Sequence, residues 1–589
     1  MIRSMVMDVE RPRRVSRWML RRFMLTLGLA VLLPACKSSE PQDSQSVASA
    51  PSGEPLEISF LVGSALGDFC KQSAERMNNS GITTTSGRPI QLKCESLGTG
   101  DVVTRLTTLV GQLKGGSLTA TAPEFPTLVA LDGDIYLTRL AQLVNQEFPG
   151  QKYVPEVADA TLIASSPMVF MTSTSLAPGL AKQADVFKIL GTATTHADID
   201  PKSPPIKIHY VHTAPTRSNS GLQALIQQFV SVTGKRPEDI TLDDVKAATA
   251  GVTVIQSHVT RYGLSTSSLA QSMVQNGTYW ASVGSVYESS VVAVNAKLPP
   301  GQEKYQAIYP RSTYTSNMRA FVSDGPWVSA DEKEAAKKVL GLLVSKDYQV
   351  LAANSGLRPA LPGIPLGALF TPDYGVNPNA TYDSLRAPSL EVVDAMLKGW
   401  VELAKKPSQV TLVVDSSGSM RGDKLPAVQR ALQIYLDGIG PRDQVSLIDF
   451  DTEIREPVRV DGSPEGKAKA MGFISGLEVG GGTALYDATL KARDDLFARY
   501  DKNAINAVIV LTDGNDEHSK ISLDELAKRI ATESTSSDQR ISFFTIGFGQ
   551  DGEFDEVALQ RIATANSGYY SKGNPQTITK VMADLQLEF

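Results

Sequence analysis

From about Leu56 to the C-terminus, short apolar segments of strand length alternate with longer segments whose apolar residues recur at helical spacing. Such alternation predicts a mixed or parallel sheet with helices on both faces, because parallel strands are joined by helical crossovers. The chain has 589 residues, which is too long for one hydrophobic core and suggests three or four units. We therefore expect an α/β protein made of several domains.

Pro407 marks the seam between two runs of this alternation. The first run, residues 55–400, opens with the strand LEISFLVG, and a pair of segments rich in β-branched residues, VTVIQS and SSVVAVNAK, continues it. A long helix, residues 329–356, opens with a Ser/Asp cap and closes at Gly356. The amphipathic stretch 390–407 leads to the seam.

The second run, residues 408–589, alternates more regularly. VTLVVD, QVSLIDF, NAVIVLTDG and RISFFTIGFG are apolar strand candidates separated by amphipathic helices. This pattern predicts a doubly wound, mostly parallel sheet. In such sheets ligands bind beyond the carboxyl ends of the strands.

The N-terminus has the features of an export signal. A basic stretch, RPRRVSRWMLRRF, precedes the apolar stretch FMLTLGLAVLLPAC, which is shorter than the roughly 20 residues of a spanning helix. LPAC resembles a bacterial lipobox, which implies a signal peptide at 1–36 and diacylation of Cys36. The alternative is a plain signal peptide with a chance cysteine.

The segment after the anchor predicts a flexible tether. Residues 37–54 are polar and rich in serine and lack apolar periodicity. Lys37 stands where an Asp often retains lipoproteins at an inner membrane, so we expect the outer membrane in a Gram-negative cell. The protein would then be a lipid-anchored membrane protein that faces the periplasm or the exterior.

Cysteine usage agrees with export. With Cys36 acylated, Cys70 and Cys94 remain as one pair in an oxidising compartment, so a disulfide between them is expected. The alternative is two separate buried thiols.

Composition excludes several classes of function. The net charge is −6 and basic runs are confined to the N-terminus, which argues against nucleic acid as a partner. The chain has five histidines and contains neither HExxH nor GxSxG. We therefore expect a binding protein and not an enzyme.

Oxygen-bearing side chains follow three strand candidates of the second run. Asp415, Ser417 and Ser419 alternate along the loop after the first strand, Thr483 lies on a glycine-rich loop, and Asp513 ends a central strand. Carboxylates and hydroxyls without sulfur or imidazole select a hard divalent cation, with Mg²⁺ expected first and Mn²⁺ or Ca²⁺ as alternatives. A DxSxS sequence alone is usually a cap or a turn.

The three parts together resemble the metal-ion-dependent adhesion site of the von Willebrand factor type A domain. The resemblance covers residues 408–589. It implies a bound cation with one open position, which accepts an Asp or Glu carboxylate from a protein partner.

Four segments of the first run resemble the bacterial extracellular solute-binding fold of the two-lobed, periplasmic-binding-protein type. They are HTAPTRSNSGLQALI, YGLSTSSLAQSMVQNG, VYESSVVAVN and KDYQVLAANSGLRPA. The resemblance implies two lobes that close on a small solute. Hydroxyls in TRSNSG precede a helix, whose N-terminus can hold a small anion; the alternative is N-capping by Ser218 or Ser220. The candidate cleft residues are Ser64, Ser165, Thr216, Ser218, Ser220, Thr266 and Tyr287.

The expected function is capture of a protein partner by the metal-dependent C-terminal domain of a lipid-anchored, exported protein. The alternative is the solute-binding component of an ABC-type transporter, specific for a small anion or another small solute, with an accessory adhesion domain.

Overall fold

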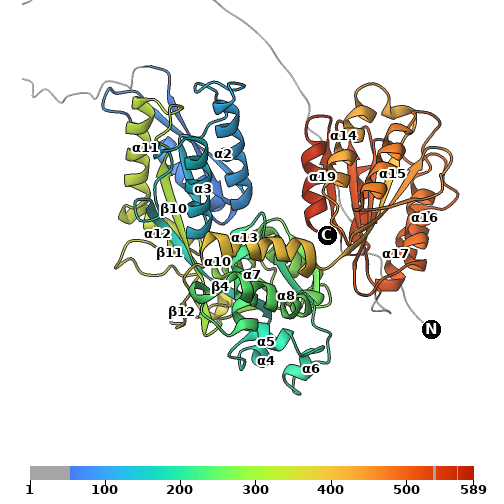
Figure 1. Cartoon of the computed structure of the whole chain (residues 1–589), viewed down its shortest axis with the longest axis horizontal. Coiled ribbons are helices and arrows are strands. Elements are labelled where there is room, and N and C mark those ends of the chain that lie inside the picture. The colour runs from blue at the N-terminus through green and yellow to red at the C-terminus, as the bar shows by residue number, and fades with distance from the viewer. Residues whose placement is uncertain (1–52, 535–538, 567) are drawn as a thin grey trace, which may run out of the picture. The chain divides into compact units, whose positions relative to one another are not determined.

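The computed structural model describes residues 53–534, 539–566 and 568–589 (Figure 1). The predicted signal peptide at 1–36 with Cys36, and all of the predicted tether but its last two residues, lie outside the described residues. None of the helices in the described ranges has the length and hydropathy of a membrane-spanning segment. The predicted α/β fold is confirmed in both runs of the chain.

A mixed sheet organises the first run. Its central strand, β4 (Thr161–Ser173), pairs through its first half with β10 (Thr315–Val322) and through its second half with β7 (Val283–Tyr287). One strand thus belongs to both halves of the sheet, as a two-lobed architecture requires. The other strands are β1 (Leu56–Gly63), β2 (Ile90–Leu97), β3 (Leu128–Leu131), β5 (Tyr210–Thr213), β6 (Val259–Gly263), β8 (Tyr305–Ile308) and β11 (Arg358–Pro359), with a separate pair β9 (Ser312–Thr313) and β12 (Asp383–Ser384). The order is β2-β1-β3-β10-β4-β7-β5-β6, and β8 and β11 pair with β4.

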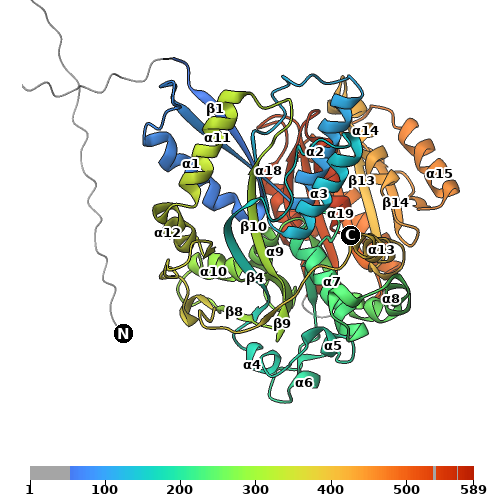
Figure 2. The same cartoon turned by 60° about the vertical axis from the view of Figure 1, so that its left-hand side comes forward.

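Helices cover both faces of this sheet. In β1, Ile58 and Phe60 pack in the cluster that includes the helix at 67–79, whereas Leu61 packs on the opposite face with the helix at 99–114. Figures 1 and 2 show α11 on one side of the part of the sheet that contains β1 and β10, and α2 and α3 on the other side. The helices are α1 (Gly67–Asn79), α2 (Thr99–Lys114), α3 (Asp134–Glu147), α4 (Ala177–Leu180), α5 (Val186–Leu190), α6 (His196–Ile199), α7 (Asn219–Thr233), α8 (Leu242–Ser257), α9 (Thr266–Asn276), α10 (Glu288–Ala296), α11 (Ala330–Leu343), α12 (Lys346–Asn354) and α13 (Leu390–Gly399).

Two expectations for this region need correction. The segments rich in β-branched residues belong to α8 and α10, because burial of their apolar faces outweighs a weak intrinsic preference for strand. The long helix at 329–356 is broken into α11 and α12 at Ser345, whose backbone is extended and whose hydroxyl donates to the carbonyl of Leu342. The predicted Ser329 cap is present as a capping box with Glu332.

The C-terminal run forms a six-stranded sheet that is parallel except for one edge strand. The strands are β13 (Ser408–Asp415), β14 (Gln444–Phe450), β15 (Val458–Asp461), β16 (Ile505–Thr512), β17 (Ile541–Phe548) and β18 (Tyr570–Gly573). Their order is β15-β14-β13-β16-β17-β18, and β15 is antiparallel to β14. Since β13 and β16 are central neighbours, the residues at their carboxyl ends lie side by side.

Both faces of this sheet are covered by helices. Leu412 and Val414 of β13 pack in the same cluster as the helix at 424–437, and Val413 packs on the other face with the helix at 485–498. Figure 1 shows α14 and α19 on one face and α16 and α17 on the other. The helices are α14 (Lys424–Asp437), α15 (Pro464–Ser475), α16 (Leu485–Ala498), α17 (Leu523–Ser534), α18 (Glu556–Thr564) and α19 (Ile578–Leu587).

Candidate metal and solute sites

Two buried carboxylates meet at the carboxyl edge of the C-terminal sheet. Asp415 ends β13, and Asp513 follows the last residue of β16. Asp415 is 0% exposed and Asp513 is 1% exposed. Burial raises the pKa of Asp415 to about 6, and the nearby carboxylate of Asp513 contributes to the rise. Two such groups in one buried place favour a bound cation.

Hydroxyls of the loop after β13 link the two carboxylates. The N–H of Ser417 donates to Oδ1 of Asp415 at 2.8 Å, and the Ser417 and Ser419 hydroxyls lie 3.0 Å apart. The Ser419 hydroxyl donates to Oδ1 of Asp513 at 2.6 Å. The loop therefore curls so that its alternate side chains face one point, as the DxSxS spacing predicts.

The glycine-rich loop brings Thr483 to the same point. The N–H of Gly480 donates to the carbonyl of Ser416 at 2.9 Å, and the N–H of Gly418 donates to the carbonyl of Gly481 at 3.1 Å. A Cβ built on Gly514 would lie 3.1 Å from Oγ1 of Thr483 and 3.6 Å from Oγ of Ser419. The structure thus gathers Asp415, Ser417, Ser419, Thr483 and Asp513.

The donor set fits a hard divalent cation. It consists of two carboxylates and three hydroxyls, and oxygen donors of this kind suit Mg²⁺, Mn²⁺ or Ca²⁺. Within the described ranges there is no cluster of three or more His, Cys, Asp or Glu side chains that could hold a metal. A site built from two acids and three hydroxyls falls outside that kind of cluster.

Sequence reasoning missed two charged residues beside this site. Nζ of Lys424 lies 2.7 Å from Oδ2 of Asp513 and 3.0 Å from Oε2 of Glu553. Partial burial acts to lower the pKa of Lys424, but its hydrogen bonds to these carboxylates and their negative charges together outweigh burial, so the pKa is raised. Glu553 is 129 residues distant from Lys424, so nothing in the local sequence pairs them.

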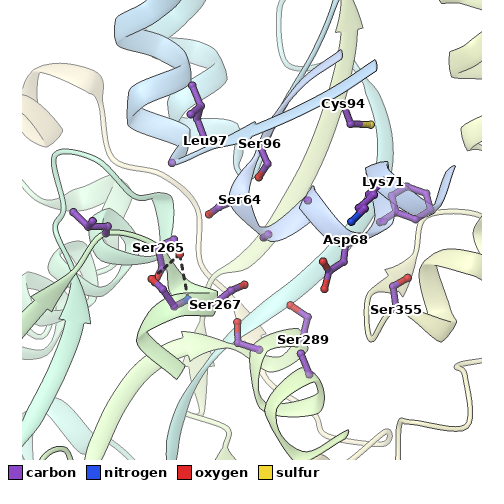
Figure 3. A pocket seen from close by; sticks show the side chains of 18 of the residues that line it. Ser64, Asp68, Lys71, Cys94, Ser96, Leu97, Ser265, Ser267, Ser289 and Ser355 are labelled. Carbon is purple, nitrogen blue, oxygen red and sulfur yellow. Dashed lines mark hydrogen bonds between the residues drawn. The ribbon is translucent and has the colours of Figure 1, made fainter. Parts of the chain in front are cut away.

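A second candidate site is a cavity of about 900 Å³ that is lined mainly by residues of the first run, together with Lys580 and Asp584 of α19. Figure 3 shows that serines from separate elements surround it, among them Ser64, Ser96, Ser265 and Ser289. Of the seven predicted cleft residues, Ser64 lines this cavity. The sequence does not predict that these serines line one cavity, because their common location depends on the packing of segments far apart in the chain.

The other predicted cleft residues lie elsewhere. Ser218, Ser220, Thr266 and Tyr287 are buried. The Ser220 hydroxyl is 2.6 Å from that of Thr266 and 3.2 Å from that of Ser218, so these groups bond one another. Ser218 is the N-cap of α7 without a side-chain cap bond.

Thr216 is exposed, and Ser165 is half-buried in β4 beside Asn317. The structure therefore does not bring the seven residues together around one cavity.

Asp132 is a buried acid that the sequence did not indicate. It is 2% exposed, and burial raises its pKa to about 6. Its Oδ2 accepts the Thr99 hydroxyl at 2.8 Å. A Cβ on Gly63 would lie 2.1 Å from Oδ1, so this carboxyl packs directly against the backbone at the end of β1.

Cys70 of α1 and Cys94 of β2 form a disulfide with their Cα atoms 6.0 Å apart. The bond ties α1 to the edge of the sheet.

Comparison with known proteins places both runs in families. The family model described as bacterial extracellular solute-binding protein matches residues 82–379, and that of the von Willebrand factor type A domain matches residues 409–584. The human inter-alpha-trypsin inhibitor heavy chain H4 is 34% identical over 173 residues, which are 28% of this chain and 18% of that protein. The chain thus spans less than a fifth of this curated relative.

Solved structures are similar at low identity. The sulfate-binding protein SubI of Mycobacterium tuberculosis has a TM-score of 0.39 and 16% identity, covering 58% of this chain and 96% of its own. The proximal thread matrix protein 1 of the mussel byssus, with a zinc-occupied MIDAS motif, has a TM-score of 0.26 and 21% identity, covering 35% and 53%. The solute-binding family model matches just over half of the chain. The chain therefore belongs to the bacterial extracellular solute-binding protein family, and it carries a von Willebrand factor type A domain on the C-terminal side of that region.

Proposed function

We propose that this protein is a lipid-anchored, exported, non-enzymatic binding protein whose C-terminal domain captures a protein partner through a divalent cation. Export agrees with membership of an extracellular family. In this proposal residues 1–36 are the signal peptide with Cys36 as the anchor, 37–54 the tether, 55–400 the solute-binding domain and 408–589 the adhesion domain. The observation that carries it is the convergence of Asp415, Asp513 and three hydroxyls.

The residues of the candidate site would contribute two kinds of metal ligand, charged and neutral. Asp415 and Asp513 supply two negative charges, whereas Ser417, Ser419 and Thr483 supply neutral oxygens. A divalent cation held by such a set would supply an electrophilic centre at which a carboxylate of the partner can bind. The Thr512 hydroxyl and the Ser417 N–H donate hydrogen bonds to Asp415 and fix the orientation of its carboxylate.

The experiment uses the immobilised full chain and envelope proteins from the source cell. We expect retention of a partner with Mg²⁺ and its release by a chelator. Asp415→Asn should abolish retention, while Asp437→Asn, at the exposed far end of α14, should not. Amidation of the partner's carboxylates with a carbodiimide should also prevent capture. Retention that is unchanged by chelator or by Asp415→Asn would contradict the proposal.

A second candidate function is solute binding for an ABC-type transporter. The serine-lined cavity of about 900 Å³ favours it, because pockets of roughly 300–1,000 Å³ hold small organic ligands. Calorimetry of the full chain with sulfate, phosphate and small polar organic solutes tests it. Heat of binding that is lost in Ser265→Ala, with no loss in Ser475→Ala on the exposed surface of α15, would favour transport.

A further inference from the structure

Lys424 places its ammonium group between two carboxylates at the edge of the candidate metal site. Its Nζ donates to Asp513 at 2.7 Å and to Glu553 at 3.0 Å. The Lys424 side chain is 20% exposed and the Asp513 side chain is 0% exposed, so solvent screens this pair only partly. A half-buried pair of this kind has a larger electrostatic effect than an exposed surface pair.

The fold fixes both partners of this lysine. Lys424 begins α14, four residues after the short helical turn that contains Ser419. Glu553 lies in the loop between β17 and α18, where its Oε2 also accepts the N–H of Gln550 at 3.0 Å. Gly549 has φ +144°, and a Cβ there would lie 2.2 Å from Oε2 of Glu553. The backbone therefore holds the Glu553 carboxylate toward Lys424.

The two oxygens of Asp513 have different partners. Oδ1 accepts the Ser419 hydroxyl, and Oδ2 accepts the ammonium of Lys424. This arrangement orients the carboxylate so that Oδ1 faces the hydroxyl cluster. Asp415, by contrast, accepts from neutral groups, the N–H of Ser417 and the hydroxyl of Thr512. The positively charged Lys424 therefore bonds directly to Asp513, which is one of the two acidic residues of the candidate site.

We propose that Lys424 sets the charge of the metal site: it lowers the affinity for a divalent cation, and Glu553 offsets part of that effect. The inference rests on the proposed metal-dependent function. Repulsion between the Lys424 ammonium group and a divalent cation held by the neighbouring Asp513 would lower the binding constant by roughly one to two orders of magnitude. A cation that its protein ligands neutralise less attracts a partner's carboxylate more strongly.

The test measures binding of Mn²⁺ alone to the full chain, by the electron paramagnetic resonance signal of free Mn²⁺. Lys424→Met removes the charge and keeps the aliphatic stem, and we expect about tenfold tighter binding. Glu553→Gln leaves the lysine uncompensated, and we expect about tenfold weaker binding. The double variant should fall within about threefold of the wild type, because the two opposite effects then cancel.

Matched controls separate charge from structure. Lys424→Arg keeps the charge and should stay within about threefold of the wild type. Lys467→Met, in α15 and bonded to the carbonyl of Asp437, should leave Mn²⁺ binding unchanged. Thermal unfolding in chelator reports whether each variant folds.

The possible results are distinguishable. A purely structural role predicts weaker binding in Lys424→Met, and that result, or no change, overturns the inference. If the wild type binds Mn²⁺ and no variant shifts it, this inference alone fails. If neither the wild type nor Lys424→Met binds Mn²⁺, the proposed metal-dependent function fails with it. If Lys424→Met does not fold, unchanged binding in Glu553→Gln overturns the inference.

Discussion

The hydroxyl of Thr512, the last residue of β16, donates to Oδ2 of Asp415, the last residue of the neighbouring strand β13. The contact exists because the two strands are parallel and in register, with Val414 opposite Leu511. It is buried on both sides, since Thr512 and Asp415 are each 0% exposed. A donor at this place supports a carboxylate that the candidate metal site requires.

Thr512→Val should destabilise the protein by about 1–3 kcal/mol, because the buried carboxylate of Asp415 loses a hydrogen-bond donor. Urea unfolding in chelator at neutral pH measures this loss. The matched control is Thr411→Val on the neighbouring strand β13, because the buried Thr411 hydroxyl has no partner among the described residues. That substitution should be neutral or slightly stabilising. Equal losses in both variants would contradict the assigned role of the Thr512 hydroxyl.

Asp132 should make the first domain more stable in mild acid. Burial raises its pKa from 3.8 to about 6, so between these values the folded state holds a proton that the unfolded state has released. The free energy of unfolding therefore rises as the pH falls from 7 to 4, by about 2 kcal/mol from this group. Asp132→Asn should remove that part of the slope in urea unfolding. Asp159→Asn, at an exposed position, should keep it; identical slopes for wild type and Asp132→Asn would refute the prediction.

The disulfide between Cys70 and Cys94 should stabilise the first domain. It closes a loop between residues 24 positions apart, which is worth about 3 kcal/mol in the chain-entropy account. The double substitution Cys70→Ala/Cys94→Ala should lose that amount in urea unfolding. A reductant should destabilise the wild type and leave the double variant unaffected. Titration of two free thiols in the unreduced, unfolded wild type would argue against the bond.

Cys36 should carry the lipid anchor. Cells grown with an alkyne-labelled fatty acid should label the wild type, and Cys36→Ser should lose both the label and the membrane association. The Cys70→Ala/Cys94→Ala variant should keep the label, which separates acylation of Cys36 from general loss of cysteine. A labelled Cys36→Ser protein would refute the anchor.

Much of the fold follows from the sequence, because the central strands are continuous apolar runs. The strands LEISFLVG and QVSLIDF coincide with β1 and β14. Buried parallel strands have this uniform composition, and turn residues mark their ends. The same regularity predicts that Asp415 and Asp513 lie at one edge of the sheet.

Intrinsic secondary-structure propensity predicted the wrong element where the burial of apolar side chains outweighed it. The segment VTVIQS is rich in β-branched residues, yet it forms the end of α8, in which Val252 and Ile255 are buried. Propensity differences of a few tenths of a kcal/mol per residue are smaller than the free energy of burying such side chains. The helix predicted at 329–356 ends early for a different, local reason: the Ser345 hydroxyl donates to the carbonyl of Leu342, and the extended backbone of Ser345 starts a new helix.

The sequence by itself determined the α/β alternation and the oxygen donors at the strand ends, and it predicts a seam at Pro407. Periodicity and strand length are local properties, so one segment at a time reveals them. Only the tertiary structure decided that Lys424 meets Glu553, that Thr512 supports Asp415, and that Ser64 alone of the predicted cleft residues lines the serine-rich cavity. Those contacts join segments far apart in the chain, and their distances depend on how helices and strands pack.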